Sequence, residues 1–298
     1  MRTTLLSCAL AAAAVTLHAQ QLEVTNETVT SSTLEDSDEN PYGSGWTDKV
    51  TVRYSFPIET KESTNDQSIV WRGNAVYTYA HLTNNGLADD YNPDDMFSAH
   101  LNVMNMRPLG GRWRLIWFAD VGIVTAFDDF TARDIVFAGG AVFAYTHDKS
   151  LSYGVGAALS TVYGAPIILP VPYVHYQSST AWVFDINMLG RIQATASRSI
   201  GKRVRLNIDI YKIEGMSANI KRGGDWKLYN STTMKSGVSP ELDLGEYGSA
   251  FLSAGVAWRR TTSIADRSYK GFFKSFNHKR RKKFGAAVDF CIGYKCTL

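Results

Sequence analysis

From residue 48 to the end of the chain, apolar side chains recur at every second position. One face of residues 112–125 carries only apolar side chains, at Trp113, Leu115, Trp117, Ala119, Val121 and Ile123. The same alternation recurs at 151–160, 203–211 and 249–258, and in shorter form at 48–56, 71–80, 97–105, 135–145 and 181–188. A period of two is the signature of a β-strand, and we find no segment with a helical period. The pattern predicts an all-β protein.

The length of these segments favours strands that cross a membrane. Several run for about 10–13 residues, against about 5–6 in soluble domains and the ~9–11 tilted residues that cross a bilayer. Aromatic residues stand near the ends of the apolar faces, at Trp113, Tyr153 and Trp258. The opposite faces are small or charged, as in the interior of a barrel. A soluble exported β-protein would show the same alternation, so it stays an alternative to the predicted single antiparallel transmembrane β-barrel over residues 48–298.

The connections between the predicted strands fall into two classes. Short turns occur at Gly110–Gly111, 147–150 and 199–202, and long polar connections occur at 83–96, 126–134 and 259–283. Outer-membrane barrels have short periplasmic turns and longer external loops, so the two classes are expected at opposite rims. About thirteen candidate strands can be counted, whereas bacterial barrels have an even number. We therefore predict about 12 strands, within a range of 10–14, and consider 48–56, 171–176 and 213–247 the weakest assignments.

The N-terminus has the order of a secretory signal peptide. Arg2 is followed by an apolar run from Leu5 to Leu17 and by the small residue Ala19. The run is too short to span a bilayer, and we predict a cleaved signal peptide over residues 1–19 and export to the bacterial outer membrane. Residues 20–47 are rich in Ser, Thr, Glu and Asp with few large apolar side chains, which predicts a flexible acidic leader.

Composition excludes several classes of function. The chain has 31 Lys and Arg against 28 Asp and Glu, a net charge of +3, which favours no nucleic-acid partner. No Walker loop, dinucleotide fingerprint or zinc-ligand spacing is present, so we predict no cofactor and no metal. Three prolines, Pro166, Pro170 and Pro172, lie between two predicted strands, where they favour a loop or a strand edge that caps a rim or folds inward.

The last residues form an alternating segment that contains two cysteines. One face carries Phe284, Val288, Phe290, Ile292, Tyr294, Cys296 and Leu298, and the other carries Asp289, Cys291 and Lys295. On a strand, Cys291 and Cys296 are about 16 Å apart at ~3.3 Å per residue. A disulfide needs Cα atoms within about 7 Å, so free thiols on opposite faces are predicted.

This final strand, with Phe290, Ile292, Tyr294 and Leu298 on one face, resembles the closing strand of bacterial outer-membrane β-barrels. That family usually ends in an aromatic residue, most often Phe, where this chain has Leu298. Within the class the chain is most similar to a barrel family of unknown function, in which residues 153–176 correspond to a strand, a proline-bearing connection and the next strand. The resemblance implies outer-membrane lipids and the barrel-assembly machinery as partners, and it implies no activity.

Charged residues on the predicted interior faces are the main candidates for a functional site. They are Arg72, Arg112, Arg114, Asp120, Asp185, Arg205, Asp209, Asp289 and Lys295. Such charges either form an ion-paired network that fills a small barrel or line a constriction that selects solutes. The first reading is favoured, and both are compatible with about twelve strands.

Two further groups of residues are weaker candidates. His175 and Ser178 supply a base and a nucleophile for an outer-membrane lipid deacylase or phospholipase, although residues three apart on a strand point to opposite faces. The basic residues Arg280, Arg281, Lys282 and Lys283 are placed to bind lipid phosphates at the rim. The sequence thus predicts a non-enzymatic outer-membrane barrel, structural or a small-solute pore, with a lipid-modifying enzyme as the alternative.

Overall fold

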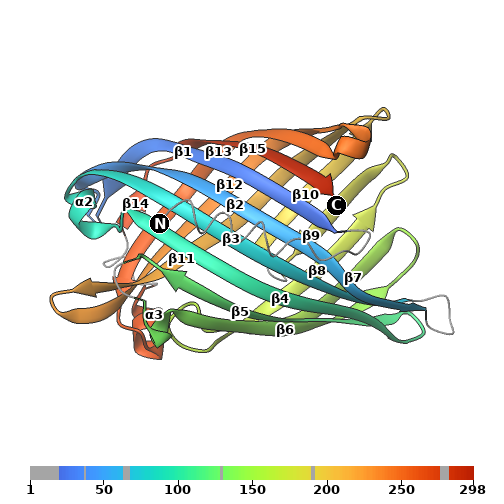
Figure 1. The fold of residues 1–298 in the computed structure, drawn as a ribbon, viewed down its shortest axis with the longest axis horizontal. Helices are drawn as coiled ribbons and strands as arrows, with labels where there is room; N and C mark the ends of the chain where they lie inside the picture. Colours follow the sequence, from blue (N-terminus) through green and yellow to red (C-terminus); the bar gives the residue numbers. More distant parts are fainter. Residues whose placement is uncertain (1–19, 37, 63–67, 128–129, 189–191, 276–281) are drawn as a thin grey trace.

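The chain forms one closed sheet of antiparallel strands (Figure 1). The computed structural model describes residues 20–36, 38–62, 68–127, 130–188, 192–275 and 282–298. Each strand from β1 to β13 pairs with the next along the chain, and β15 (Ala287–Thr297) pairs with both β13 and β1 (Gln21–Glu35), which closes the ring. The predicted all-β barrel is therefore confirmed. The predicted signal peptide, residues 1–19, lies outside the described residues.

The strands vary in length around the ring. The first eight are β1 (Gln21–Glu35), β2 (Pro41–Glu62), β3 (Ser68–Gly86), β4 (Asp95–Gly110), β5 (Trp113–Thr125), β6 (Ile135–Thr146), β7 (Leu151–Ser160) and β8 (Ile167–Gln177). The rest are β9 (Trp182–Asn187), β10 (Ile192–Ile200), β11 (Val204–Arg222), β12 (Asp225–Asp243), β13 (Ser249–Ala265), β14 (Lys282–Phe284) and β15 (Ala287–Thr297). Short helices lie in the connections: α2 (Leu87–Tyr91), α3 (Tyr269–Ser275), η1 (Ala132–Asp134) and η2 (Gly245–Tyr247).

The predicted flexible leader over residues 20–47 is wrong. Residues Gln21–Glu35 form β1, and residues from Pro41 onward already belong to β2. The low apolar content of this segment does not prevent folding, because β1 needs no core of its own. It gains hydrogen-bonded ladders with β2 on one side and β15 on the other, and its inward Glu27 faces a polar interior.

The ring has fourteen strand positions. β14 and β15 both lie between β13 and β1, and together they occupy one position. The number lies within the predicted range and above the predicted twelve. The sequence shows about thirteen candidate strands, and the even number is reached by adding one strand and not by removing one. All three weak assignments are strands, in β2, β8 and β12, and the missing one is β1.

The two classes of connection lie at opposite ends of the barrel. The short turns at 111–112, 147–150 and 201–203 share the end where β15 finishes, whereas the long connections with α2, η1 and α3 share the other (Figure 1). We call these the turn end and the outer end. In outer-membrane barrels the short turns are periplasmic and the longer loops are external, so the outer end is the expected extracellular end.

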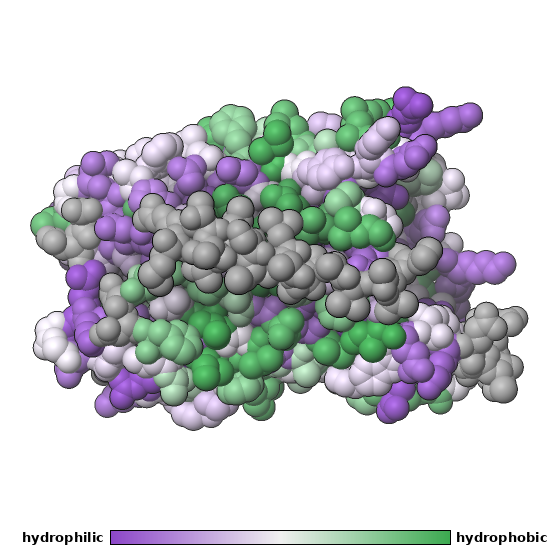
Figure 2. Space-filling model, in the orientation of Figure 1, coloured by the Kyte–Doolittle hydropathy of each residue, from purple (hydrophilic) through white to green (hydrophobic). Residues whose placement is uncertain are grey.

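The outward face of the strands is apolar. Exposed outward side chains include Leu101, Phe137, Val155, Leu252 and Ile292. Figure 2 shows hydrophobic side chains over the middle of the surface and strongly hydrophilic ones at the ends. A closed barrel with an apolar outside meets the main requirement for crossing a bilayer with strands, since the ring has no free edge strand. No helix among the described residues is long and apolar enough to span a membrane.

Aromatic side chains form a girdle near the turn end. The rings of Trp113, Tyr145 and Tyr153 lie on three neighbouring strands, with centroids 5.1 and 5.8 Å apart. Such belts lie at the membrane–water interface because one edge of each ring is polar. Trp258 lies elsewhere, in the middle of β13, where its indole bonds to a neighbouring strand.

The final strand β15 places its residues as the alternation predicts, whereas Phe284, predicted on the same face, lies on β14 and is buried against Leu34 and Ala88. Phe290, Ile292 and Tyr294 are exposed on the outer surface, and Leu298 is exposed beyond the end of β15. The two cysteines, Cys291 and Cys296, are free, and they pair in register with Glu27 and Leu22 of β1. They occupy opposite faces of β15, so the predicted free thiols are confirmed.

The strands β11, β12 and β13 bend where their registers shift. The shifts fall between Asp209 and Lys212 on β11 and between Met234 and Lys235 on β12, with Trp258 as the extra residue of β13. Ser236 connects these sites, because its hydroxyl donates to the Ile210 carbonyl at 2.7 Å and accepts from the Trp258 indole at 3.2 Å. Neighbouring β-bulges at one level bend a sheet. We call this level the bulge line.

Beyond the bulge line, the outer half of β11 crosses to the opposite wall. β10 pairs with β11 only up to Ile213, and Asn219 then pairs with Thr125 of β5. The Asn219 amide donates to the Asp134 carboxylate at 2.8 Å and to the Arg133 carbonyl at 3.0 Å. Strands β1–β5 and β11–β14 thus form a narrower ring at the outer end.

Pro170 and Pro172 lie on the stretch of β8 that β9 does not pair, where a missing N–H costs no ladder bond.

We expect the substitution Ser236→Ala to lower the free energy of unfolding by about 1–2 kcal/mol, because two hydrogen bonds of the bulge line are lost. Urea unfolding in detergent, followed by tryptophan fluorescence, measures this change. Ser253→Ala is the matched control, since the Ser253 hydroxyl forms no hydrogen bond with another described residue. Equal stability of the two variants would contradict a role for Ser236 in holding the bend.

Candidate functional site

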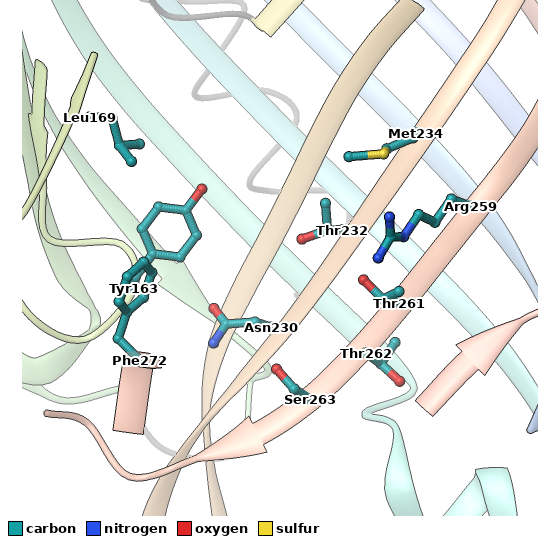
Figure 3. Close-up of a pocket in the computed structure, with 10 residues that line it drawn as sticks. All are labelled: Tyr163, Leu169, Asn230, Thr232, Met234, Arg259, Thr261, Thr262, Ser263 and Phe272. Atoms are coloured by element: carbon teal, nitrogen blue, oxygen red, sulfur yellow. The ribbon is translucent and has the colours of Figure 1, made fainter. Parts of the chain in front are cut away.

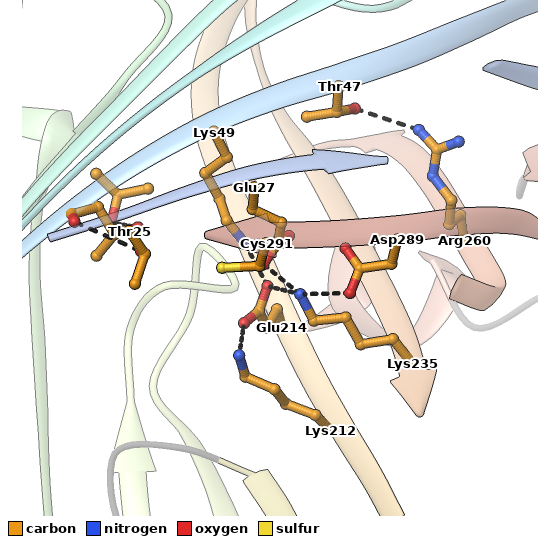
Figure 4. A network of polar contacts seen from close by, with 12 residues as sticks. Thr25, Glu27, Thr47, Lys49, Lys212, Glu214, Lys235, Arg260, Asp289 and Cys291 are labelled. Carbon is orange, nitrogen blue, oxygen red and sulfur yellow. Dashed lines mark hydrogen bonds and ion pairs between the residues drawn. The ribbon is translucent and has the colours of Figure 1, made fainter. Parts of the chain in front are cut away.

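Six charged side chains meet in the middle of the barrel (Figure 4). They are Glu27 of β1, Lys49 of β2, Lys212 and Glu214 of β11, Lys235 of β12 and Asp289 of β15. We call them the central ion cluster. Lys49 and Glu214 form an ion pair although four strand positions of the ring separate β2 from β11. The cluster therefore bridges facing walls across the lumen.

The cluster is a connected network and is balanced in charge. Nitrogen–oxygen distances are 2.8 Å for Lys49–Glu27, 2.6 Å for Lys212–Glu214, 3.2 Å for Lys235–Glu214 and 3.6 Å for Lys235–Asp289. Lys235 also forms an ion pair with Glu27. Three lysines thus face three carboxylates, which keeps the cost of burying each charge low. Lys212 and Glu214 are the more accessible members, with side chains 22% and 26% exposed.

An apolar cluster closes the narrower ring beyond the ion cluster. We call it the outer plug. It joins Ala80, Leu82 and Met96 from one wall to Ala218, Ile220 and Tyr229 from the other, with Ala126 between them. Tyr229 is fully buried, and its hydroxyl donates to the Asn92 side-chain oxygen at 3.0 Å. The Asn92 amide in turn donates to the Asn84 side-chain oxygen at 2.9 Å. The bend at the bulge line brings these two walls together.

The turn-end half of the lumen is lined by polar pairs. His100 and Asp120 lie 2.9 Å apart, His175 and Asp185 lie 2.6 Å apart, and Lys295 lies 3.1 Å from Glu241. These pairs place Asp120, Asp185 and Lys295 on the interior, as the alternation predicts. His100 and His175 each lie on the strand next to that of the aspartate they contact.

The remaining predicted lumen charges occupy different places. By register, Arg72, Arg114, Arg205 and Asp209 share the inner face with Met104, Ala144, Glu241 and Gly237, respectively. Asp289 belongs to the central ion cluster. Arg112 does not lie in the interior as predicted. Arg112 lies in the turn before β5, which begins at Trp113, so it does not follow the alternation of that strand. Its guanidinium donates to the His147 carbonyl at 2.8 Å.

His175 and Ser178 do not form a nucleophile–base pair. His175 faces the lumen and contacts Asp185, whereas Ser178 lies in the turn after β8, where its hydroxyl contacts that of Thr180 at 2.9 Å. A catalytic pair requires a hydrogen bond between nucleophile and base, or one bridging water. No group of three or more His, Cys, Asp or Glu side chains in the described part of the chain is arranged to hold a metal ion.

Only part of the predicted basic cluster can be placed. Arg280 and Arg281 lie outside the described residues. The Lys282 ammonium lies over the rings of Tyr42 and Tyr91, 2.8 and 4.8 Å from their centroids, while Lys283 is exposed. Lys282 is thus held by cation–π contacts at the rim. Binding of lipid phosphates by this segment stays a prediction.

Sequence reasoning missed five of the six members of the central ion cluster. Glu27 lies in the segment predicted to be a flexible leader, and Lys49 lies on a predicted strand but not among the predicted lumen charges. The other three members lie at or beyond register shifts, and after such a shift the opposite set of alternate residues points inward. They are Lys212, Glu214 and Lys235. The available signal was the charge itself, since a lysine or glutamate inside a membrane strand points inward or to an interface.

Two cavities lie on opposite faces of β12 and β13. A chamber of about 50 Å³ separates the central ion cluster from the outer plug and is lined by Ser231 and Thr233, among others. A cavity of about 270 Å³ lies on the other face, beside Asn230, Thr232 and Thr261 (Figure 3). Alternate residues of β12 therefore line different cavities. We call the larger one the side cavity.

The closed ring, its apolar outer surface and its polar lumen define a transmembrane β-barrel of the outer-membrane type. Within this class, the chain belongs to the family described as a domain of unknown function (DUF6268), whose model matches residues 15–297. None of the curated proteins matches the chain.

Several solved barrels are similar in outline over nearly the whole chain. One is an outer-membrane channel from Pseudomonas putida F1, with 8% identity, 95% of this chain and 97% of that chain covered, and a TM-score of 0.46. The transport unit of the autotransporter AIDA-I from Escherichia coli has 11% identity, coverages of 99% and 97%, and a TM-score of 0.36. The outer membrane protease OmpT from Escherichia coli has 8% identity, coverages of 96% and 99%, and a TM-score of 0.27.

Proposed function

We propose that this protein is an outer-membrane channel for small hydrophilic solutes, with the central ion cluster as its selective constriction. The observation that carries the proposal is that long charged side chains from facing walls meet at mid-barrel, above a polar lumen. Rings of charged side chains select solutes in known pores. Lysine and glutamate side chains have several rotatable bonds, so they can part for a solute more readily than a packed apolar core.

The outer plug supplies the closure in this proposal. It lies directly beyond the constriction, and the small chamber between the two is the space that remains on the solute path. The plug depends on the inward bend of β11–β13, whose outermost turn, at Gly223 and Gly224, is a tight hairpin. A channel built this way conducts rarely, and only when the outer half of β11–β13 moves away from β3 and β4.

We expect charge changes in the central ion cluster to shift ion selectivity in opposite directions. Lys212→Gln leaves an excess carboxylate and should raise cation selectivity, whereas Glu214→Gln leaves an excess lysine and should raise anion selectivity. Reversal potentials of single channels in planar bilayers under a salt gradient measure both. Each change should be at least about twofold in permeability ratio, or about 0.4 kcal/mol.

Lys61→Gln is the control for these measurements. The Lys61 side chain is 66% exposed and pairs with Glu59 near the turn end, away from the central ion cluster. A channel whose selectivity does not move in either cluster variant would contradict the constriction. Absence of any opening in wild type and variants, with all proteins folded by heat-modifiable gel migration, would favour a purely structural barrel.

A further inference from the structure

The outward faces of β12 and β13 change character at the bulge line. On the turn-end side, their outward residues are apolar and exposed, at Val238, Leu242, Leu252 and Val256. Beyond the line, the corresponding face carries Asn230, Thr232, Thr261 and Ser263. Polar groups that face hydrocarbon without partners cost several kcal/mol each in general. On this face, Asn230 accepts a hydrogen bond from the Ser217 hydroxyl of β11 at 2.6 Å, and all four polar residues line one cavity.

Two connections cover this face and leave the side cavity beneath them. Phe272 of α3 contacts Tyr163 of the β7–β8 connection, with ring centroids 5.4 Å apart, and packs with Ala165 and Ile167. The connection is tightly seated, since a Cβ added to Gly164 would lie 3.0 Å from a Leu228 methyl group of β12. The cover is thus a packed part of the fold. The cavity beneath it is built from residues far apart in the sequence.

The side cavity has one apolar wall and one polar wall. Tyr163, Leu169 and Phe272 form the apolar wall, and the hydroxyl and amide groups of β12 and β13 form the other (Figure 3). The Arg259 side chain extends along the polar wall toward Thr232 and Thr261. Within the described part of the chain, Arg259 forms no ion pair. A cation without a counter-charge beside hydroxyl groups is suited to an anion.

We propose that the side cavity binds a small amphipathic carboxylate. Its apolar body would lie against Tyr163, Leu169 and Phe272, and its carboxylate would bond to Arg259 and to the hydroxyls of Thr232 and Thr261. The volume of about 270 Å³ lies just below the ~300–1,000 Å³ of sites for drug-sized ligands, which limits the body to one aromatic ring or a short alkyl chain. The site lies on the opposite face of β12–β13 from the solute path, so it stands whether or not the barrel conducts.

The size of the site argues against a whole phospholipid as its occupant. Two acyl chains exceed the cavity, and a phosphate headgroup offers no apolar body for the aromatic wall. A carboxylate of the stated size has two sources, because aromatic acids come from water and short alkyl acids partition into the membrane. Both share the chemistry that Arg259 and the apolar wall recognise. The experiment includes one probe of each kind.

The test is calorimetric titration of the purified full-length barrel in nanodiscs with 4-phenylbutyrate, with octanoate and with the neutral amide of 4-phenylbutyrate. We expect saturable binding of at least one carboxylate, with the amide at least about tenfold weaker because a charge-assisted hydrogen bond is lost. Arg259→Gln should weaken the carboxylate about tenfold or more and leave the amide unchanged. Phe272→Ala should weaken both.

Arg205→Gln is the matched control, since Arg205 is a lumen arginine on a neighbouring strand and lines no part of the side cavity. Its carboxylate affinity should equal that of wild type. Folding of every variant is checked by heat-modifiable gel migration, and Thr232→Val supplies a second, milder change in the site. The proposal is overturned if neither carboxylate binds, or if Arg259→Gln and wild type bind the carboxylate equally. Preference for octanoate over 4-phenylbutyrate would assign the ligand to the membrane, and the reverse preference to water.

Discussion

Replacing Tyr229 with alanine should lower the free energy of unfolding by about 3–5 kcal/mol, as for other large aromatic side chains removed from a packed interior. Tyr229 is 0% exposed and contacts the apolar residues of the outer plug from the opposite wall. The same substitution should raise single-channel conductance and open probability, because the cavity it leaves adjoins the chamber beyond the central ion cluster. Urea unfolding and planar-bilayer recordings measure the two effects on one preparation.

Tyr229→Phe separates the two roles of the side chain. It keeps the ring and removes only the hydrogen bond to Asn92, which should cost about 1–3 kcal/mol because a buried acceptor loses its partner. Conductance should stay at the wild-type value. If Tyr229→Ala loses stability while its conductance does not change, the outer plug does not limit the solute path, and the closure assigned to it is wrong.

Replacing Lys235 with alanine should have an effect of similar size for an electrostatic reason. Lys235 is 4% exposed and pairs with Glu27, Glu214 and Asp289. Removing one partner of a buried ion pair typically costs about 3–5 kcal/mol, because the remaining charges are left uncompensated. The unfolding midpoint in urea should fall accordingly, while Lys61→Ala, at an exposed position, should leave it unchanged within about 0.5 kcal/mol.

A double substitution tests the cause of that loss. If uncompensated charge is responsible, Lys235→Met combined with Glu27→Gln should recover much of the stability that Lys235→Met loses alone. Additive losses in the double variant would mean that the Lys235 side chain matters for packing and not for charge. The two outcomes differ by several kcal/mol, well above the error of unfolding measurements.

The closed shape of the barrel follows from features that the sequence displays locally. Inward and outward faces alternate with a period of two, so Trp113, Tyr153, Ile292 and the two faces of the final strand could be assigned from position alone. The opposite faces of Cys291 and Cys296 follow from the same rule. The length and number of such segments predict a barrel because an open sheet of that size leaves unpaired edges in the membrane.

The first strand and the candidate sites depend on contacts that no local pattern encodes. β1 has few apolar residues and exists because β2 and β15 pair with both of its edges. The register shifts of β11–β13 reset the alternation, so Asp209 and Lys212 both point inward although they are three residues apart. Arg112 shows the converse, since a residue in a turn no longer follows the faces of its strand.

The sequence by itself determined the fold class, the direction of most strand faces and the state of the cysteines, because these depend on backbone geometry within one strand. Only the tertiary structure decided which charges meet. The central ion cluster joins β1, β2, β11, β12 and β15, and the side cavity joins β12 and β13 to two outer connections. Both depend on the bulge line, where a bend in three strands brings facing walls within the reach of a side chain.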